Sequence, residues 1–377
     1  MQLLVFCNPE NRRIDLLRQS AVQTGWSIKP ISYERLLTDA VDLEAEARGC
    51  IAARIDSPGE NFAVERMLLA RGSELAAQLG YQCLAAEAAL RLEYELGRIH
   101  FPGQYFLGFT ALLHDIDAQL PSMRWMNSPQ AVETMFDKPA TIACLQAQGL
   151  QTPIQLGGVA SFEQLRELLE ARGLKRVFVK LTTSSSASGV VAIVRQGDRL
   201  RATTTVEMVD GGRGERKLYN SLKLQHLNHT TEIERLIDCL VPHRIFAEQW
   251  LPKAAYDHRS TFDLRAMVID GVATHFVPRV SSSPMTNLHL GNRRGDWAWV
   301  EHRLGVNLER FRQTCSQAAG AIQGVFYSGL DVVIDPTWKR FQVLEANACG
   351  DLLPGLVDVK GDSTYTAQLR RLAELLG

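Results

Sequence analysis

Apolar positions alternate between short runs and helical spacing through the first hundred residues. Residues 3–7 form a continuous apolar run that is typical of a buried strand, and residues 49–55 are again strand-like. Residues 11–24 carry apolar side chains at positions 14, 16, 17, 21 and 22, the spacing of an amphipathic helix. Residues 62–79 and 85–96 are rich in strong helix formers. This alternation predicts a small α/β domain with a parallel sheet.

Strand-like runs dominate the later part of the chain. Residues 177–180 are a strand-like run that ends in a lysine, residues 247–251 close another predicted strand, and residues 261–271 have the pattern of a hairpin arm. Two further runs, 329–334 and 341–347, are separated by a short turn that contains Asp, Pro and Thr. These runs predict antiparallel strands, with the last two forming a hairpin.

Three features of the pattern are less informative about function. Residues 103–120 contain several aromatic side chains, which predicts packing against the following domain. Trp297 and Trp299 alternate in a strand-like run, where they either line a substrate cleft or pack between domains. His226 and His229 form an HxxH pair with no third ligand nearby in the sequence, so we expect them at the surface.

The final hairpin carries oxygen ligands at suitable positions for a metal ion. Asp331 lies on its first strand, and Glu345 and Asn347 lie on its second. Residues two apart on a strand share a face, so Glu345 and Asn347 can converge while Leu344 and Ala346 point to the other side. Mg²⁺ prefers oxygen ligands and keeps waters and phosphates in its shell. The hairpin therefore predicts a magnesium site for a nucleoside triphosphate, the alternative being ordinary surface carboxylates.

In their chain order, these features resemble the ATP-grasp superfamily of carboxylate–amine ligases. The similarity is greatest to the branch that contains glutamate-adding and glutathione-synthetase-like enzymes. It extends from about residue 127 to 355. It rests on the segments 137–141, 177–189, 247–251, 261–271, 287–292, 329–334 and 341–347.

The resemblance implies an N-terminal parallel-sheet α/β domain followed by an ATP-grasp fold of two subdomains. It implies ATP as the nucleotide, with Mg²⁺ or Mn²⁺ at Asp331, Glu345 and Asn347. Two lysines would reach the phosphates, a small-residue loop would cover them, and a strand edge would bind the adenine. The residues that match these three elements are Lys138 and Lys180, then Ser184, Ser185, Ser186, Ser188 and Gly189, and finally Glu248, Gln249, Trp250 and Leu251.

The resemblance also assigns the ribose and the transferred phosphate. Asp263 matches the acid that holds the ribose hydroxyls, and Asp257 is a rival because the stretch around it is longer than usual. Arg265 shares a strand face with Asp263 and matches an arginine directed to the transferred phosphate. Arg279 is either a clamp on the acyl phosphate or a surface arginine.

The sequence departs from the family pattern at three places. Residues 210–217 form a charged insertion that either guides an acidic substrate or is a solvated loop. Residues 348–350 read Ala-Cys-Gly where the glutamate-ligase branch tends to carry Ser-Pro-Gly, and residues 292–295 read Asn-Arg-Arg-Gly where a double glycine is expected. These departures weaken the assignment to that branch and leave the substrates open.

Composition and charge fit a soluble enzyme. The chain has 377 residues, which predicts two or three domains, and its net charge of −1 argues against a dedicated nucleic-acid or acidic-membrane surface. The seven cysteines include no CxxC pair and are expected to be reduced, with Cys349 packed rather than reactive. No basic leader or apolar run of about 20 residues is present. A cytoplasmic protein is therefore expected.

The expected organisation is an N-terminal domain over residues 1–125 and an ATP-grasp domain over 126–377. The latter divides at about residue 250 into a part with the lysines and loop and a part with the metal ligands. Arg54 and Asp56 stand at the end of the predicted strand over 49–55, where open parallel sheets bind ligands, the preferred alternative being a turn without a ligand.

The resemblance implies a reaction through an acyl phosphate. A small-molecule or peptide carboxylate would attack the γ-phosphate of ATP, and an amine would then displace phosphate to form an amide. A small-molecule kinase on the same scaffold and an ATP-binding module without catalysis are the two alternatives. No nucleic-acid or membrane partner is expected, and a homodimer is one arrangement open to the chain.

Overall fold

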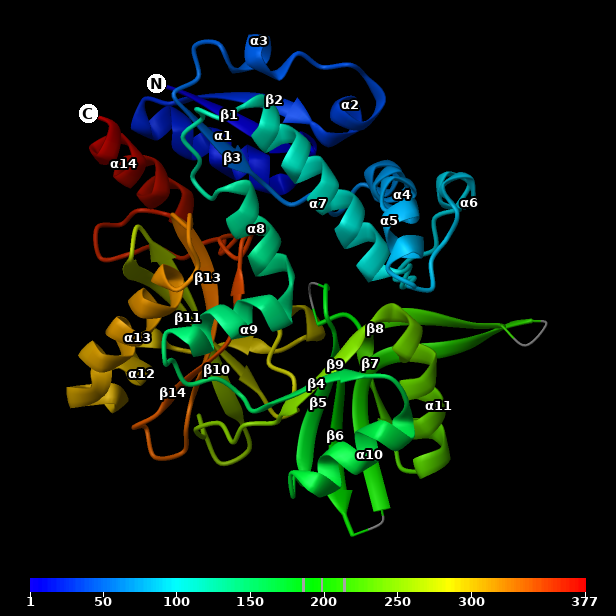
Figure 1. Ribbon diagram of the computed structural model, residues 1–377. Coiled ribbons are helices and arrows are strands. Elements are labelled where there is room, and N and C mark those ends of the chain that lie inside the picture. The colour runs from blue at the N-terminus through cyan, green and yellow to red at the C-terminus, as the bar shows by residue number, and fades with distance from the viewer. Residues whose placement is uncertain (185–186, 198, 213–214) are drawn as a thin grey trace.

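The N-terminal part of the computed structural model is a small α/β unit, and Figure 1 shows it above two further sheets. The structure describes residues 1–184, 187–197, 199–212 and 215–377. The first sheet is parallel with the order β2-β1-β3, which confirms the predicted fold class. Its elements are β1 (Gln2–Cys7), α1 (Arg12–Thr24), β2 (Ser27–Ser32), α2 (Tyr33–Thr38), α3 (Leu43–Ala47), β3 (Ala52–Ile55), α4 (Phe62–Arg71), α5 (Ser73–Gln78) and α6 (Ala86–Leu90).

Residues 103–120, for which the sequence predicted packing but no element, form most of helix α7 (Pro102–Gln119). This helix crosses α4 so closely that a Cβ added at Gly108 would lie 1.9 Å from the carbonyl oxygen of Leu68. A Cβ at Gly72 would likewise lie 2.0 Å from the carbonyl oxygen of Gln104. Gly72 also separates α4 from α5, so the single predicted helix over 62–79 is two helices. The predicted helix over 85–96 is limited to α6.

The second part is built on a six-stranded sheet with the order β4-β9-β5-β6-β7-β8. Helices α10 and α11 contribute apolar side chains to the core of this sheet. The charged segment 210–217 lies at the tip of the long β7–β8 hairpin, and its residues 213 and 214 lie outside the described part. The elements are β4 (Gln155–Val159), α10 (Phe162–Ala171), β5 (Arg176–Leu181), β6 (Val191–Gln196), β7 (Arg199–Gly212), β8 (Glu215–Leu227), α11 (Thr230–Leu240) and β9 (Ile245–Gln249).

The third part is a five-stranded antiparallel sheet with the order β12-β11-β10-β13-β14. Helices α8 and α9 connect the N-terminal unit to the other two parts, and α14 returns to pack against α1 (Figure 1). The elements are α8 (Pro129–Phe136), α9 (Lys138–Ala147), β10 (Thr261–Ile269), β11 (Val272–Ser281), β12 (Arg293–Arg294), α12 (Trp297–Leu304), α13 (Leu308–Gly320), β13 (Tyr327–Ile334), β14 (Phe341–Asn347) and α14 (Thr364–Leu376).

The strand-like interpretation of the tryptophan pair is wrong. Trp297 and Trp299 lie in the first turn of α12, which Asp296 caps through its side chain. The Trp297 ring stacks on Phe276 with a centroid distance of 4.2 Å, and Trp299 packs on Tyr256 at 4.6 Å. Both rings are partly buried and pack against the core around the five-stranded sheet.

The segment that precedes α7 joins the N-terminal unit to the six-stranded sheet. The main-chain amide of Ile99 donates to the carbonyl oxygen of Leu218 at 2.9 Å. The main-chain amide of Asn220 donates to the carbonyl oxygen of Gly97 at 2.7 Å. The Ile99 side chain is buried in the core of the six-stranded sheet. The chain thus touches this sheet some fifty residues before its first strand begins. None of the helices in the described ranges combines the length and the apolar character that crossing a bilayer requires.

Candidate functional site

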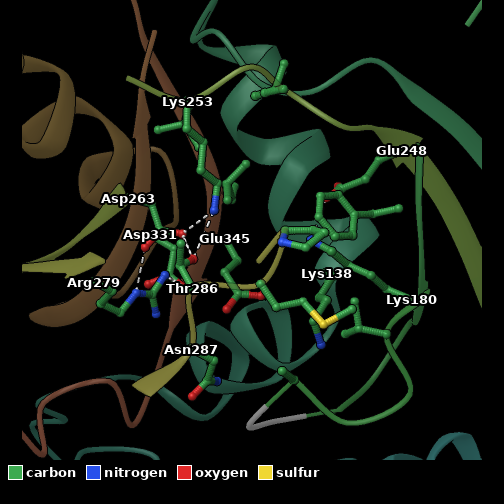
Figure 2. Close-up of a pocket in the computed structure, with 18 of the residues that line it drawn as sticks. Lys138, Lys180, Glu248, Lys253, Asp263, Arg279, Thr286, Asn287, Asp331 and Glu345 are labelled. Carbon is green, nitrogen blue, oxygen red and sulfur yellow. Dashed lines mark hydrogen bonds and ion pairs between the residues drawn. The ribbon is translucent and has the colours of Figure 1, made fainter. Parts of the chain in front are cut away.

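A cavity lies between the six-stranded and five-stranded sheets, with residues from both sheets and from α9 in its wall (Figure 2). It encloses about 900 Å³ of space not filled by protein, part of which is open to solvent. The structure brings the following residues of the predicted site together in its lining: Lys138, Lys180, Ser184, Glu248, Gln249, Leu251, Asp263, Arg265, Arg279, Asp331, Glu345 and Asn347.

The oxygen ligands predicted for a metal lie side by side on β13 and β14. Asp331 and Glu345 are direct partners in the register of the two strands. The amide nitrogen of Asn347 donates to the carboxylate of Glu345 at 3.4 Å and to the carbonyl oxygen of Gly329 at 3.0 Å. The next pair in the register is Val332 with Val343, so Leu344 is an extra residue in a β-bulge. The expectation that Leu344 faces away is therefore wrong, and it lines the cavity beside Glu345.

The charges at this edge fit a divalent cation. Burial raises the pKa of Glu345 above its usual value, and the neighbouring Asp331 raises it further. A cation between the two carboxylates would favour their ionised forms. Within the described ranges, no group of three or more His, Cys, Asp and Glu side chains is placed to hold a metal. The donor set is two carboxylates and one amide, which suits Mg²⁺ because that ion keeps waters and substrate phosphates in its shell.

Asp331 is also shared by two arginines. Its Oδ1 atom lies 2.5 Å from Nε of Arg265, and its Oδ2 atom lies 3.0 Å from Nη2 of Arg279. Burial alone would raise the pKa of Asp331, but the two guanidinium groups lower it below its usual value. Asp331 is therefore held ionised while the pKa of its neighbour Glu345 is raised.

Arg279 continues this chain of charges from Asp331 to Asp263 (Figure 2). Its Nε donates to Oδ1 of Asp263 at 2.8 Å, and Nζ of Lys253 lies 3.0 Å from Oδ2 of the same carboxylate. The hydroxyl of Thr286 also donates to Oδ2. Although burial opposes it, the pKa of Asp263 is lowered by Arg279 and Lys253. Both oxygens of Asp263 are thus already bonded within the protein, and its assignment to the ribose stays a prediction.

Lys253, Thr286 and Asn287 are polar residues of the site to which the sequence analysis assigned no role. Lys253 follows the strand-edge segment by two positions, after Pro252, and Thr286 and Asn287 lie in the loop after β11. Loop residues share no periodicity that would place them on a common face. The one local signal for Lys253 was its proximity to Leu251 in the sequence.

The two predicted phosphate lysines occupy different environments. Nζ of Lys180 lies 2.5 Å from Oε1 of Glu248, whose other oxygen accepts a hydrogen bond from Gln155 at 3.2 Å. Burial would lower the pKa of Lys180, but Glu248 and Glu345 raise it. Lys138 donates to the carbonyl oxygen of Ser184 at 2.5 Å and to its hydroxyl at 3.2 Å. Burial lowers the pKa of Lys138, although the charges of Glu345 and Glu248 act in the opposite direction.

The loop after Lys180 is tightly folded where it is described. The hydroxyl of Ser184 donates to the carbonyl oxygen of Ser188 at 3.2 Å. Gly189 has φ +69°, and a Cβ at this position would lie 2.3 Å from Cδ1 of Leu181, so a glycine is needed there. Ser188 and Gly189 support the loop and do not line the cavity, whereas Ser185 and Ser186 lie outside the described residues.

The cavity also has apolar lining residues. They include Phe178, Val190, Leu251 and Met285, together with Leu344. Leu251 belongs to the strand-edge segment predicted to bind adenine.

Two further predicted nucleotide contacts, Trp250 and Asp257, also lie outside the cavity wall. The Trp250 ring packs on Phe178 at 5.2 Å, and its amide donates to the carbonyl oxygen of Arg176 at 3.2 Å. Asp257 lies in an exposed loop, where Ser260 donates to it at 2.7 Å and Arg293 pairs with it at 2.8 Å. Of the two acids proposed for the ribose, only Asp263 lines the cavity.

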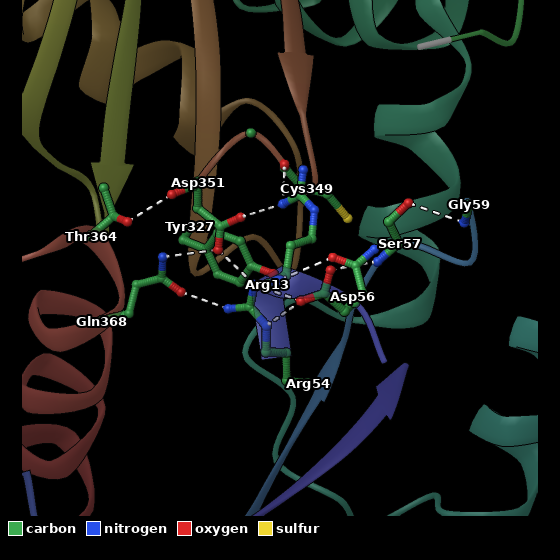
Figure 3. Close-up of polar contacts among 12 residues, drawn as sticks. Arg13, Arg54, Asp56, Ser57, Gly59, Tyr327, Cys349, Asp351, Thr364 and Gln368 are labelled. Atoms are coloured by element: carbon green, nitrogen blue, oxygen red, sulfur yellow. Dashed lines mark hydrogen bonds and ion pairs between the residues drawn. The ribbon is translucent and has the colours of Figure 1, made fainter. Parts of the chain in front are cut away.

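Arg54 and Asp56, the predicted ligand-binding pair of the N-terminal domain, are parts of a buried ion cluster (Figure 3). Arg54 is fully buried, 3.3 Å from Asp56 and 2.5 Å from Asp351. A side chain with no exposed surface has no room for a ligand, so a ligand contact at Arg54 is contradicted. His226 and His229 are exposed, as predicted.

Comparisons with known proteins support the fold. No protein-family model matches the sequence, and no curated protein matches it. The structure is similar to D-cycloserine synthetase DcsG, with 15% identity, a TM-score of 0.55 and 100% of both chains covered. It is similar to the ATP-grasp ligase PsnB, solved with a precursor variant, Mg and ADP, with 14% identity, a TM-score of 0.53 and coverage of 100% of this chain and 98% of that one. It is also similar to D-alanine–D-alanine ligase from Bacillus anthracis, with 10% identity, a TM-score of 0.52 and coverage of 100% of this chain and 95% of that one.

Proposed function

The chain has the fold of the ATP-grasp superfamily, and we propose that it is an ATP- and Mg²⁺-dependent ligase that joins a carboxylate to an amine. The observation that carries this proposal is the arrangement of charges around one cavity. Lys138 and Lys180 approach it from one side, and Asp331 and Glu345 approach it from the other. Phosphoryl transfer depends on positioning and charge neutralisation, for which this arrangement is suited.

In the proposed reaction the substrate carboxylate is first phosphorylated. One of its oxygens attacks the γ-phosphorus of ATP, and the bond from that phosphorus to the ADP oxygen breaks. The nitrogen of the amine then attacks the carbonyl carbon of the acyl phosphate, loses a proton and expels inorganic phosphate. A magnesium ion, when bound, would neutralise negative charge on the phosphates.

Each group has a proposed role in these steps. Asp331, Glu345 and Asn347 would hold the metal, and Lys138 and Lys180 would hold the phosphates. Arg279 is fixed on two sides by Asp263 and Asp331, which aims its guanidinium at the cavity. We assign Arg279 and Arg265 to the transferred phosphoryl group, whose charge they would stabilise without moving.

The domain division is part of the same proposal. Residues 1–125 would contribute to the acceptor site, 126–250 would carry the lysines and the covering loop, and 251–377 would hold the metal. The nucleotide base would lie beside the apolar residues Phe178 and Met285. We propose that the carboxylate substrate and the amine substrate are each an amino acid or a short peptide.

The test is to incubate the protein with ATP and Mg²⁺ and a panel of amino acids and short peptides, following phosphate release and product mass. A ligase releases phosphate only when both a carboxylate and an amine are present, and Glu345→Ala abolishes this release. A phosphorylated acceptor formed with ADP but without phosphate release would identify a kinase instead. Binding of ATP without any ADP formation would identify a non-catalytic module.

A further inference from the structure

The loop that follows the proposed metal strand is held by the N-terminal unit. Residues 348–351 leave β14 directly after Asn347. Nη1 of Arg13, on α1, donates to the carbonyl oxygen of Cys349 at 2.9 Å and to Oδ1 of Asp351 at 3.2 Å. One guanidinium group thus holds the loop at both a main-chain and a side-chain oxygen (Figure 3).

Asp351 is the centre of a buried and charge-balanced cluster. It is fully buried and also binds Arg54 at 2.5 Å and Gln368 at 3.2 Å. The cluster contains two arginines, Arg13 and Arg54, and two aspartates, Asp56 and Asp351. Burial would raise the pKa of Asp351, but Arg54 and Arg13 lower it. Asp351 is therefore ionised and keeps a strong partner in Arg54 if Arg13 is replaced.

The same loop also contacts Arg265, which lines the cavity. Nη1 of Arg265 donates to the carbonyl oxygen of Gly350 at 3.4 Å. Gly350 is packed so closely that an added Cβ would lie 3.0 Å from Cβ of Asn347 and 2.8 Å from Cα of Gly329. A shift of the Cys349 main chain would therefore be passed to Asn347 and Arg265 through direct contact.

From these contacts we propose that Arg13 is a positioning residue for the metal edge of the site. By holding the Cys349 carbonyl and the Asp351 carboxylate, it fixes the orientation of Asn347 and Arg265. The effect of this positioning on metal binding and catalysis rests on the proposed function. Arg13 suits this role better than Arg54, because its side chain is 16% exposed and its loss leaves no isolated buried charge.

The test compares Arg13→Gln and Arg13→Lys with Arg18→Gln. Arg18 lies on the same helix, is exposed and pairs only locally with Asp15, so it is the matched control. Hydrogen exchange of residues 345–351 is measured without nucleotide. Arg13→Gln is expected to raise exchange there by at least about tenfold, because bonds from a charged donor are lost. Arg13→Lys is expected to restore part of the protection, since an ammonium can still reach one acceptor.

A second measurement separates positioning from general stability. Affinity for ADP is determined with and without Mg²⁺, alongside the melting temperature. For Arg13→Gln we expect weaker binding of Mg²⁺ with ADP, unchanged binding of ADP alone and a melting temperature close to that of Arg18→Gln. Unchanged exchange at 345–351, or an increase spread over the whole chain, would overturn the inference. Failure of the wild-type protein to bind any nucleotide would refute the proposed function, and the exchange result would still decide the role of Arg13.

Discussion

Asp331 and Glu345 face each other across β13 and β14, and the charge of the first raises the pKa of the second. Asp331 itself keeps a lowered pKa because Arg265 and Arg279 bind it. Without a cation, ionisation of Glu345 is disfavoured relative to its usual behaviour, whereas ionisation of Asp331 is favoured. A metal ion placed beside them would favour ionisation of both, so metal binding and proton release are coupled.

This coupling predicts that binding of Mg²⁺ with nucleotide releases protons and tightens as pH rises. The pKa of Glu345 lies above its usual 4.5 in the free protein, and a metal would lower it. Affinity is therefore lost as pH falls through the raised pKa. Titration calorimetry in buffers of different ionisation enthalpy, between about pH 5 and pH 8, measures the proton release.

Glu345→Gln is the control for this prediction. It removes the ionisable group with little change in shape, so the proton release should disappear together with most of the metal affinity. Because an ionised Glu345 is disfavoured in the folded protein, the variant should also melt at a higher temperature at neutral pH. Equal proton release by the variant and the wild type would contradict the assignment.

Lys253→Met tests the chain of charges that ends at Arg279. It removes a donor from Asp263 and leaves Arg279 and Thr286 to satisfy that carboxylate. We expect unfolding to become easier by about 1–3 kcal/mol and kcat to fall, because Arg279 is less well fixed. Urea unfolding and steady-state kinetics measure the two effects.

The sign of the pH dependence provides a further check on Lys253. The pKa of Asp263 is lowered in the folded protein, so its stabilisation is present above the usual value of 3.8 and is lost as pH falls. In Lys253→Met this acid-dependent loss should be smaller. Lys360→Met, at an exposed site, should behave as the wild type, and an equal effect of both variants would show that Lys253 has no specific role.

The parts of the fold that the sequence predicted well are those with a repeating pattern. The period-two spacing of Glu345 and Asn347 placed both on one strand beside Asp331, and that arrangement is observed. The same rule failed for Leu344, because a β-bulge adds one residue to the strand. A bulge depends on the partner strand and leaves no mark on the local sequence.

Other features depended on contacts between distant segments. The spacing of Trp297 and Trp299 was compatible with a strand, and the Asp296 cap and packing on Phe276 decided for a helix. The role of Arg54 was hidden because its partner Asp351 lies in the last part of the chain. Such pairings are set by tertiary packing, which outweighs local preference.

Ile99→Ala tests how the N-terminal segment supports the six-stranded sheet. Ile99 is 5% exposed and lies in the core of that sheet, so its truncation should cost about 2–5 kcal/mol. Hydrogen exchange should increase first in β7 and β8, because Leu218 pairs with this segment. Leu96→Ala, at a residue 81% exposed, is the matched control and should have little effect. Loss of protection that begins in the parallel sheet would contradict this prediction.

Gly350→Ala tests the close approach between the loop and the site most directly. Its Cβ would lie 2.8 Å from Cα of Gly329 and 2.9 Å from Nη1 of Arg265, so one of these groups must move. We expect a loss of about 1–3 kcal/mol in the free energy of unfolding and a fall in kcat larger than the rise in KM for ATP. Gly320→Ala is the control, since nothing lies within 4 Å of its added Cβ and it should be neutral or slightly stabilising. If Gly350→Ala kept wild-type kcat and stability, the loop would be free to shift without disturbing Arg265.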